Sequence, residues 1–426
     1  MNKTKLIKPE LLMPAGNLEK LEYAIKYGAD AVYLGVVDFS LRSMRKGEVI
    51  TLDNLKHAVD LARGLGARAY LTLNIFAFNN DIENLEKCID IIKDANPDAI
   101  ILSDFGVFRT VKKHMPNMPI HVSTQANTLN YEAVKFWQDN GAKRVILARE
   151  LPIADVAEMR AKVPDIELEV FVHGAQCMSF SGRCLLSDYM TDNERKANKG
   201  NCSQPCRWEY ALVERTRPGQ FYEIEQTERG AHILSTKDLC LVEHLQKLID
   251  AGINSFKVEG RTKSLYYVSA VAKAYRNAID EIWENPNANL SKYFEELKKV
   301  GNRGYTQGFY LGKNDENSYS YDVSKGLAGA DFLCEFWEGL EDGEGEKVFK
   351  VKVKNKLLLN DEVEIITPDE QFISKVTEIK NKDGENLEVA NTNEELFLKF
   401  SISPKSHKYT MARTPGIRIK GKEQII

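Results

Sequence analysis

Four cysteines, Cys177, Cys184, Cys202 and Cys206, have the spacing expected of ligands that share one metal centre. They form a C-x6-C pair and a C-x3-C pair, with seventeen residues between the pairs. Four thiolates hold either a structural Zn²⁺ ion or a [4Fe–4S] cluster. From the spacing alone these two alternatives stay open, and unliganded buried thiols are a weaker third.

A fifth cysteine, Cys240, is an alternative fourth ligand. We expect it at the start of a helix, where the helix dipole favours a thiolate. A catalytic Cys–His pair is also conceivable, because His173 lies four residues before Cys177. A lone nucleophile does not account for the other cysteines, so this reading ranks low. Cys88 and Cys334 read as ordinary core thiols.

The elements that must position these side chains repeat one pattern over the first 280 residues. Short apolar runs alternate with stretches whose apolar residues recur at three- and four-residue steps, which is typical of amphipathic helices. Eight such strands predict a parallel (β/α)8 barrel, with an open doubly wound sheet as the competitor. The predicted strands are Glu10–Met13, Ala31–Gly35, Arg68–Leu73, Ala99–Leu102, Ile120–Ser123, Arg144–Leu147, Leu168–Val172 and Ser255–Val258.

The active site of such a barrel lies at the carboxyl ends of its strands. That rule selects a polar, mostly cationic set of side chains, although a structural role is the more common one for any single member. The set is Asn17, Arg42, Asn74, Asp104, Gln125, Asn127, Arg149, His173, Lys257, Glu259 and Arg261.

We divide the chain into three parts. Residues 1–282 form the barrel, and residues 174–250 are an insertion after its seventh strand that carries the cysteines. Such long excursions at this end of a barrel are usually functional. Residues 283–328 link the barrel to residues 329–426, where alternating apolar and polar residues predict a small antiparallel β-barrel.

The net charge of −4 does not indicate nucleic-acid binding by the molecule as a whole. Two stretches are locally basic, residues 195–217 and residues 399–422. Each is read equally well as a solvated face or as an RNA contact. No run is long enough for a signal sequence or a membrane span, so we expect a cytoplasmic protein that does not bind a membrane.

The sequence resembles a family of collagenase-like proteins that were classed as peptidases of unassigned mechanism. The likeness rests on LLMPAGNLEKLEYAIKYGADAVYLG, HVSTQAN, EVFVHGAQCMSFSGRCLLS, KGNCSQPCRWEY and FKVEGRTKSLYYVSAVAKAYRNAID, and it covers nearly the whole chain. The family signature E-x-F-x2-G-[SA]-x-C-x4-G-x-C-x2-S is met from Glu169 to Ser187. Gln176 departs from the aliphatic residue usual at its position.

Within that family the chain is most similar to the branch that hydroxylates tRNA. The resemblance implies oxygen-independent formation of 5-hydroxyuridine at the wobble position, with tRNA as partner and a prephenate-like carboxylate as co-substrate. Relatives hydroxylate a ribosomal RNA cytidine or act in ubiquinone hydroxylation, and the latter carry a [4Fe–4S] cluster. This implication favours the cluster over Zn²⁺, with Cys177, Cys184, Cys202 and Cys206 as ligands and Cys240 as the alternative fourth.

Roles for the other residues follow as expectations. Catalytic candidates are Asn74, Gln125, His173 and Glu259. Cationic side chains give charge-assisted hydrogen bonds to a carboxylate, and those expected to hold the metabolite are Arg149, Lys257, Arg261 and Lys263. The competing hypotheses are a peptidase, which lacks support from an HExxH or GxSxG motif, and a non-catalytic iron–sulfur or zinc protein.

Overall fold

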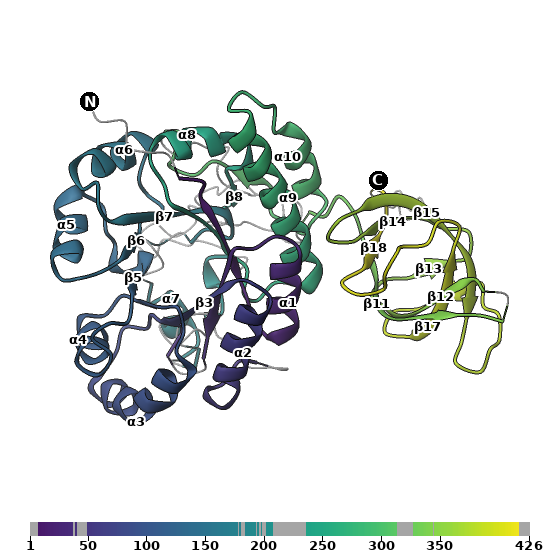
Figure 1. Cartoon of the computed structure of the whole chain (residues 1–426), viewed down its shortest axis with the longest axis horizontal. Helices are drawn as coiled ribbons and strands as arrows, with labels where there is room; N and C mark the ends of the chain where they lie inside the picture. The colour runs from purple at the N-terminus through teal and green to yellow at the C-terminus, as the bar shows by residue number, and fades with distance from the viewer. Residues whose placement is uncertain are drawn as a thin grey trace, which may run out of the picture. The chain divides into compact units, whose positions relative to one another are not determined.

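The computed structural model divides the chain into two compact units, shown in Figure 1. The first comprises residues 1–294 and 302–326, and the second comprises residues 295–301 and 327–426. The described residues are 7–36, 39–40, 49–177, 179, 184–192, 194–195, 197, 202–207, 236–312, 327–343 and 345–416. None of the described helices is long and apolar enough to cross a bilayer.

The first unit is a closed barrel of eight parallel strands. Its strands are β1 (Glu10–Pro14), β2 (Ala31–Gly35), β3 (Arg68–Leu73), β4 (Ala99–Leu102), β5 (Ile120–Val122), β6 (Arg144–Ile146), β7 (Glu167–Gly174) and β9 (Ser255–Val258). Neighbours in this order pair in parallel, and β9 pairs with both β7 and β1. This closure confirms the predicted (β/α)8 barrel and excludes an open sheet.

Helices surround the strands of this unit (Figure 1). They are α1 (Leu18–Lys26), α2 (Leu52–Gly64), α3 (Asn79–Ala95), α4 (Phe105–His114), α5 (Tyr131–Asp139), α6 (Ile153–Lys162), α8 (Leu245–Asp250) and α9 (Leu265–Glu284). Each buries an apolar stripe, such as Leu55, Ala58, Val59 and Ala62 of α2, as the three- and four-residue spacing predicted.

Two short strands extend the barrel sheet beyond β7. Strand β8 (Asp238–Cys240) pairs antiparallel with the end of β7, and β10 (Tyr305–Thr306) pairs in parallel with β8. The expectation that Cys240 begins a helix was therefore wrong. It pairs with His173 in the sheet, and the helical residues η5 (Val242–His244) and α8 follow it.

The described part of the cysteine-bearing insertion contains α7 (Leu186–Met190) and the single turn η4 (Pro205–Arg207). Most of the basic stretch at residues 195–217 lies outside the described residues, as does Arg42.

The second unit is a closed antiparallel barrel, as predicted. Its strands follow the order β11 (Phe332–Glu341), β12 (Lys347–Val353), β17 (Glu395–Phe400), β15 (Gln371–Lys380), β14 (Glu362–Ile366) and β18 (Met411–Arg413). A separate pair joins β13 (Leu357–Leu358) and β16 (Val389–Ala390). Alternate side chains of β12, Phe349, Val351 and Val353, enter an apolar core.

Helix α10 (Ser291–Lys298) ends in a segment that belongs to this second unit. Glu296 accepts a hydrogen bond from Arg413, which is fully buried and also donates to Glu364 at 2.8 Å. Residues 295–301 are thus part of the second unit rather than of a separate linking segment.

Candidate functional site

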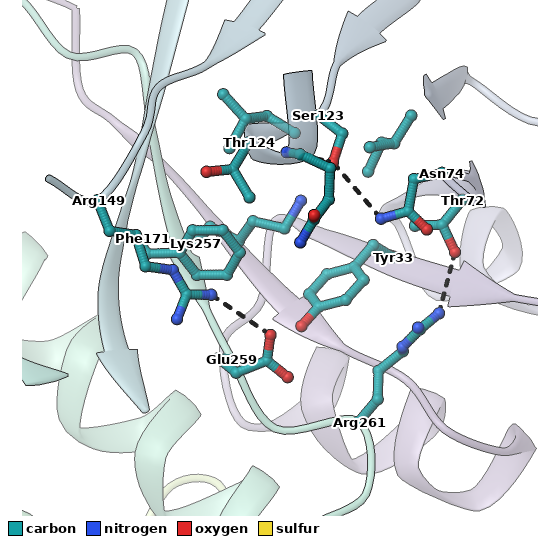
Figure 2. Close-up of a pocket in the computed structure, with 13 residues that line it drawn as sticks. Tyr33, Thr72, Asn74, Ser123, Thr124, Arg149, Phe171, Lys257, Glu259 and Arg261 are labelled. Carbon is teal, nitrogen blue, oxygen red and sulfur yellow. Dashed lines mark hydrogen bonds and ion pairs between the residues drawn. The ribbon is translucent and has the colours of Figure 1, made fainter. Parts of the chain in front are cut away.

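A cavity of about 60 Å³ opens at the carboxyl ends of the barrel strands (Figure 2). It brings together six residues selected from the sequence, which are Asn74, Gln125, Arg149, Lys257, Glu259 and Arg261. Residues within or just after the strands complete its lining: Tyr33, Thr72, Ile101, Ser123, Thr124, Ile146 and Phe171. Three cations and one carboxylate line this cavity, so it suits a small anion.

Arg261 is held on one side of the cavity by hydroxyl groups. Its Nη1 donates to Ser40 Oγ at 2.6 Å and to Thr72 Oγ1 at 2.9 Å. The guanidinium also lies 5.8 Å from the centre of the Tyr33 ring. A Cβ atom on Gly35 would lie 1.8 Å from Arg261 Nη1, so β2 needs glycine here to leave room for the arginine.

Arg149 approaches the cavity from the opposite side (Figure 2). Its guanidinium carbon lies 3.7 Å from the centre of the Phe171 ring, and its Nη2 lies 3.5 Å from Glu259 Oε2. It also donates to the backbone oxygen of Ala175 at 2.7 Å. Because Ala175 is two residues before Cys177, this bond ties the cavity wall to the start of the cysteine-bearing insertion.

Lys257 lies at one end of a series of buried ion pairs in the barrel interior. Its Nζ lies 3.1 Å from Glu169, which also accepts from Arg144 at 2.9 Å. Arg144 in turn donates to Glu10 at 2.6 Å. Burial lowers the pKa of Lys257, and the Glu169 carboxylate partly offsets this by favouring the ammonium.

Neutral polar groups line another part of the cavity. Asn74 donates weakly to Ser123 Oγ at 3.4 Å, and the same hydroxyl accepts from the backbone N–H of Gln125 at 3.3 Å. Thr124 donates to the backbone oxygen of Leu147 at 3.0 Å. The short turn η1 (Thr124–Ala126) after β5 therefore fixes this wall.

His173 does not line the cavity, although we selected it as a catalytic candidate. A bulge in the pairing of β7 with β9 falls between Phe171 and His173, and bulges of this kind re-aim a side chain. The imidazole lies among the rings of Tyr267, Tyr275 and Tyr305. Burial lowers the pKa of His173 to about 3.

Lys263 is also outside the cavity lining, and its Nζ lies 5.1 Å from the centre of the Tyr267 ring. Two further side chains selected from strand ends cap helices. Asn17 accepts from the N–H of Lys20, and Asp104 accepts from those of Gly106 and Val107. Asn127 adopts the left-handed conformation at the end of η1.

Of the four candidate ligands in the insertion, Cys177 and Cys202 are exposed, whereas Cys184 and Cys206 are half-buried. Backbone N–H groups point at two of the sulfurs, from Leu186 to Cys184 Sγ and from Gln204 to Cys202 Sγ, each at 3.3 Å. Such N–H donors stabilise thiolate ligands. Among the residues that the structure describes, however, no three Cys, His, Asp or Glu side chains gather as a metal site.

Ser187 connects the two cysteine pairs. Its buried hydroxyl donates to the backbone oxygen of Arg195 at 2.6 Å and accepts from the N–H of Ser203 at 2.9 Å. Ser187 is three residues from Cys184, and Ser203 is next to Cys202. The chain thus brings the two cysteine segments side by side.

Cys240 differs from these thiols in its surroundings. It is buried on β8, with its Sγ 3.8 Å from the Tyr275 hydroxyl. Burial raises the pKa of the Cys240 thiol to about 12, which opposes the thiolate form.

Comparison with known families gives one match for each of the two units. The profile of peptidase family U32 matches residues 16–320, and that of the peptidase family U32 C-terminal domain matches residues 330–413. This chain belongs to peptidase family U32. The family resemblance expected from the sequence is confirmed.

Relatives in this family carry names from RNA modification. This chain is 36% identical to tRNA hydroxylation protein P of Haemophilus influenzae, over 97% of this chain and 99% of the relative. It is 37% identical to tRNA hydroxylation protein P1 of Bacillus subtilis, over 95% of this chain and 94% of the relative. It is 32% identical to the 23S rRNA 5-hydroxycytidine C2501 synthase of Escherichia coli, over 88% of this chain and 55% of the relative.

Proposed function

We propose that this U32 protein is an RNA-modifying enzyme that hydroxylates the wobble uridine of tRNA to 5-hydroxyuridine. The observation that carries the proposal is the similarity to tRNA hydroxylation protein P across both units. The relative named as an rRNA hydroxycytidine synthase supports the same class of reaction, hydroxylation of a pyrimidine base.

Hydroxylation replaces a C–H bond of the base with C–OH, which is a two-electron oxidation and requires a source of oxygen. We assign the cavity to the co-substrate, a small prephenate-like carboxylate. Arg149 and Arg261 face the cavity from opposite sides, and Lys257 adds a third cation. Guanidinium groups bind carboxylates through paired, charge-assisted hydrogen bonds, which supports this assignment.

We further propose that Cys177, Cys184, Cys202 and Cys206 hold a [4Fe–4S] cluster, with Zn²⁺ as the alternative. Four cysteine side chains, two of them with backbone N–H donors at the sulfur, fit such a group chemically. The cluster would supply electron transfer or bind the oxygen donor. Ser187 holds together the two segments that carry the cysteines. The hydrogen bond from Arg149 to the backbone of Ala175 joins the first of these segments to the cavity wall.

The second unit offers a surface for RNA. Trp337 of β11 is exposed, and Lys350 and Lys352 of β12 lie 5.8 and 5.7 Å from its ring centre. Stacking of bases on aromatic rings near cations is a common mode of single-stranded RNA binding. Lys399 and Lys405 of the basic stretch we expected here are paired with carboxylates, as Lys350 and Lys352 are with Glu395, so the exposed Trp337 ring is the main feature of this surface.

Peptide hydrolysis, which the family's name suggests, has less support from the geometry. Neither histidine nor cysteine is among the residues that line the described cavity, so a Cys–His or Ser–His pair is lacking there.

The direct test is mass spectrometry of tRNA nucleosides from a strain that lacks this gene. We expect 5-hydroxyuridine and its derivatives to disappear, and to return with the wild-type gene but not with Arg261→Gln. The matched control is Arg63→Gln, which alters an ion-paired arginine on α2 outside the cavity and should restore the nucleosides. Unchanged nucleosides in the deletion strain would refute the proposed function.

A further inference from the structure

Lys257 is the one primary amine among the three cations that line the described cavity, and both it and Arg261 are almost fully buried. It lies at the carboxyl end of β9 with 4% of its surface exposed, yet it lines the cavity. Its Nζ lies 4.5 Å from the centre of the Tyr33 ring and 5.5 Å from that of Phe171. The other two cations are guanidinium groups, so the cavity offers one primary amine beside two arginines that can bind a carboxylate.

The series of buried ion pairs beneath Lys257 also limits how strongly its ammonium is stabilised. Glu169, its acidic partner at 3.1 Å, is shared with Arg144 at 2.9 Å. A lysine that is desolvated and close to another cation loses its proton more readily than a surface lysine. Lysines in such surroundings serve as amine nucleophiles toward carbonyl compounds.

We propose that Lys257 forms a covalent imine with a small α-keto acid bound in this cavity. The ligand class follows from what the cavity presents together, an amine for the carbonyl carbon and two guanidinium groups for the adjoining carboxylate. The volume of about 60 Å³ favours the compact end of such a molecule. The inference deepens the proposed function, since it assigns the chemical class of the co-substrate of that same site.

The reaction balances without any oxidant. Glu169 accepts a proton from the Lys257 ammonium, and the free amine attacks the carbonyl carbon to form a carbinolamine. Glu259, the carboxylate that lines the cavity, carries the two remaining protons of the nitrogen in turn to the oxygen, which leaves as water while the C=N bond forms, and Glu169 returns its proton to the imine nitrogen. The 3.1 Å separation of Lys257 Nζ from Glu169 Oε1 suits the proton transfers between these two groups.

Borohydride trapping of the purified full-length protein tests the inference, with pyruvate as the α-keto acid probe. The hydride reduces an imine to a stable secondary amine, which peptide mass spectrometry then assigns to a residue. We expect the adduct on Lys257, and we expect lactate, which has no keto group, to give none. No adduct in wild-type protein, or modification spread over exposed lysines, would overturn the inference.

Two variants separate a covalent role from a fixed charge. Lys257→Arg keeps the cation but removes the primary amine, so the adduct should be lost. Lys143→Arg, at the opposite end of the barrel strands, should form the adduct as the wild type does. Mapping in the wild type decides the question even where Lys257→Arg folds poorly.

The outcome is independent of the proposed function. Loss of the tRNA nucleosides together with no trapped adduct would refute the imine alone. An adduct on Lys257 in a protein whose deletion leaves tRNA unchanged would support the imine and refute tRNA hydroxylation.

Discussion

At the scale of single residues, His173 makes the stability of the barrel depend on pH. The folded protein keeps this buried imidazole neutral down to a pKa of about 3, whereas an unfolded chain protonates histidine near its ordinary value of about 6.5. Because the unfolded state binds more protons between these values, stability falls as the pH drops through that window.

We therefore expect His173→Gln to flatten this dependence. Between about pH 7 and about pH 5, His173 costs the wild type roughly 2 kcal/mol that the variant does not lose. Urea unfolding of both proteins at the two pH values measures the difference. Equal losses in the two proteins would show that His173 is protonated in the folded state or that its site opens.

The cavity residues test the rule that active-site residues of a parallel barrel lie at the carboxyl ends of its strands. It found Arg149, Lys257 and Arg261, because parallel strands of a barrel deliver their carboxyl ends to one mouth. It missed Tyr33 and Phe171, which lie within strands, because assigning inward-facing positions needs the register of neighbouring strands. A polar residue after a strand can also cap the next helix, as Asn17 and Asp104 do. The sequence alone does not distinguish this role from a place in the cavity.

At the scale of elements, strand β8 bears on the choice between Cys206 and Cys240 as the fourth ligand. It places Cys240 in the sheet against His173, with its Sγ 3.8 Å from the Tyr275 hydroxyl and its thiol buried. A strand of three residues held by so few pairs carries little sequence signal, so the sequence did not distinguish it from the start of the helical residues that follow.

We predict that Cys206→Ser abolishes most cluster binding and that Cys240→Ser retains it. After anaerobic purification, the measurements are the iron and sulfide content and the absorption near 400 nm, roughly where iron–sulfur charge transfer absorbs. If Cys206→Ser keeps the cluster and Cys240→Ser loses it, Cys240 rather than Cys206 is the fourth ligand. Stoichiometric zinc in colourless wild-type protein would refute the cluster itself.

Strands β11 and β12 carry the RNA-binding prediction. The pairing of β11 with β12 shifts register between Phe336 and Glu338, so the bulge presents Trp337 outward. Loss of one base stack costs about 1–3 kcal/mol, so Trp337→Ala should weaken binding of an anticodon stem-loop roughly 5- to 150-fold. Trp337→Phe should retain most of the affinity.

The matched control is Ile402→Ala, which removes another exposed apolar side chain from the same unit. Fluorescence anisotropy with a labelled stem-loop measures all three variants. Equal affinity of Trp337→Ala and Ile402→Ala would exclude Trp337 as a stacking platform.

At the scale of the whole molecule, both barrels could be predicted from periodicity, but the boundary between the units could not. The first eight strands alternate with helices, and the strands beyond residue 330 alternate polar with apolar residues, so each pattern indicates one architecture. Residues 295–298 are the last turn of α10, and nothing local shows that Glu296 contacts the second unit. Its partner Arg413 is more than a hundred residues away.

That long-range pair predicts which unit depends on residues 295–301. Arg413 is a fully buried cation, and removal of one of its two acidic partners leaves part of its charge uncompensated. Glu364 remains, so Glu296→Gln should destabilise the second unit by about 1–3 kcal/mol and leave the first unchanged. Glu295→Gln, at an exposed neighbour paired with Lys298, should change neither unit. Hydrogen exchange read by mass spectrometry reports the two units separately. Faster exchange in β9 as well as in β14 and β18 would mean that the two units unfold together.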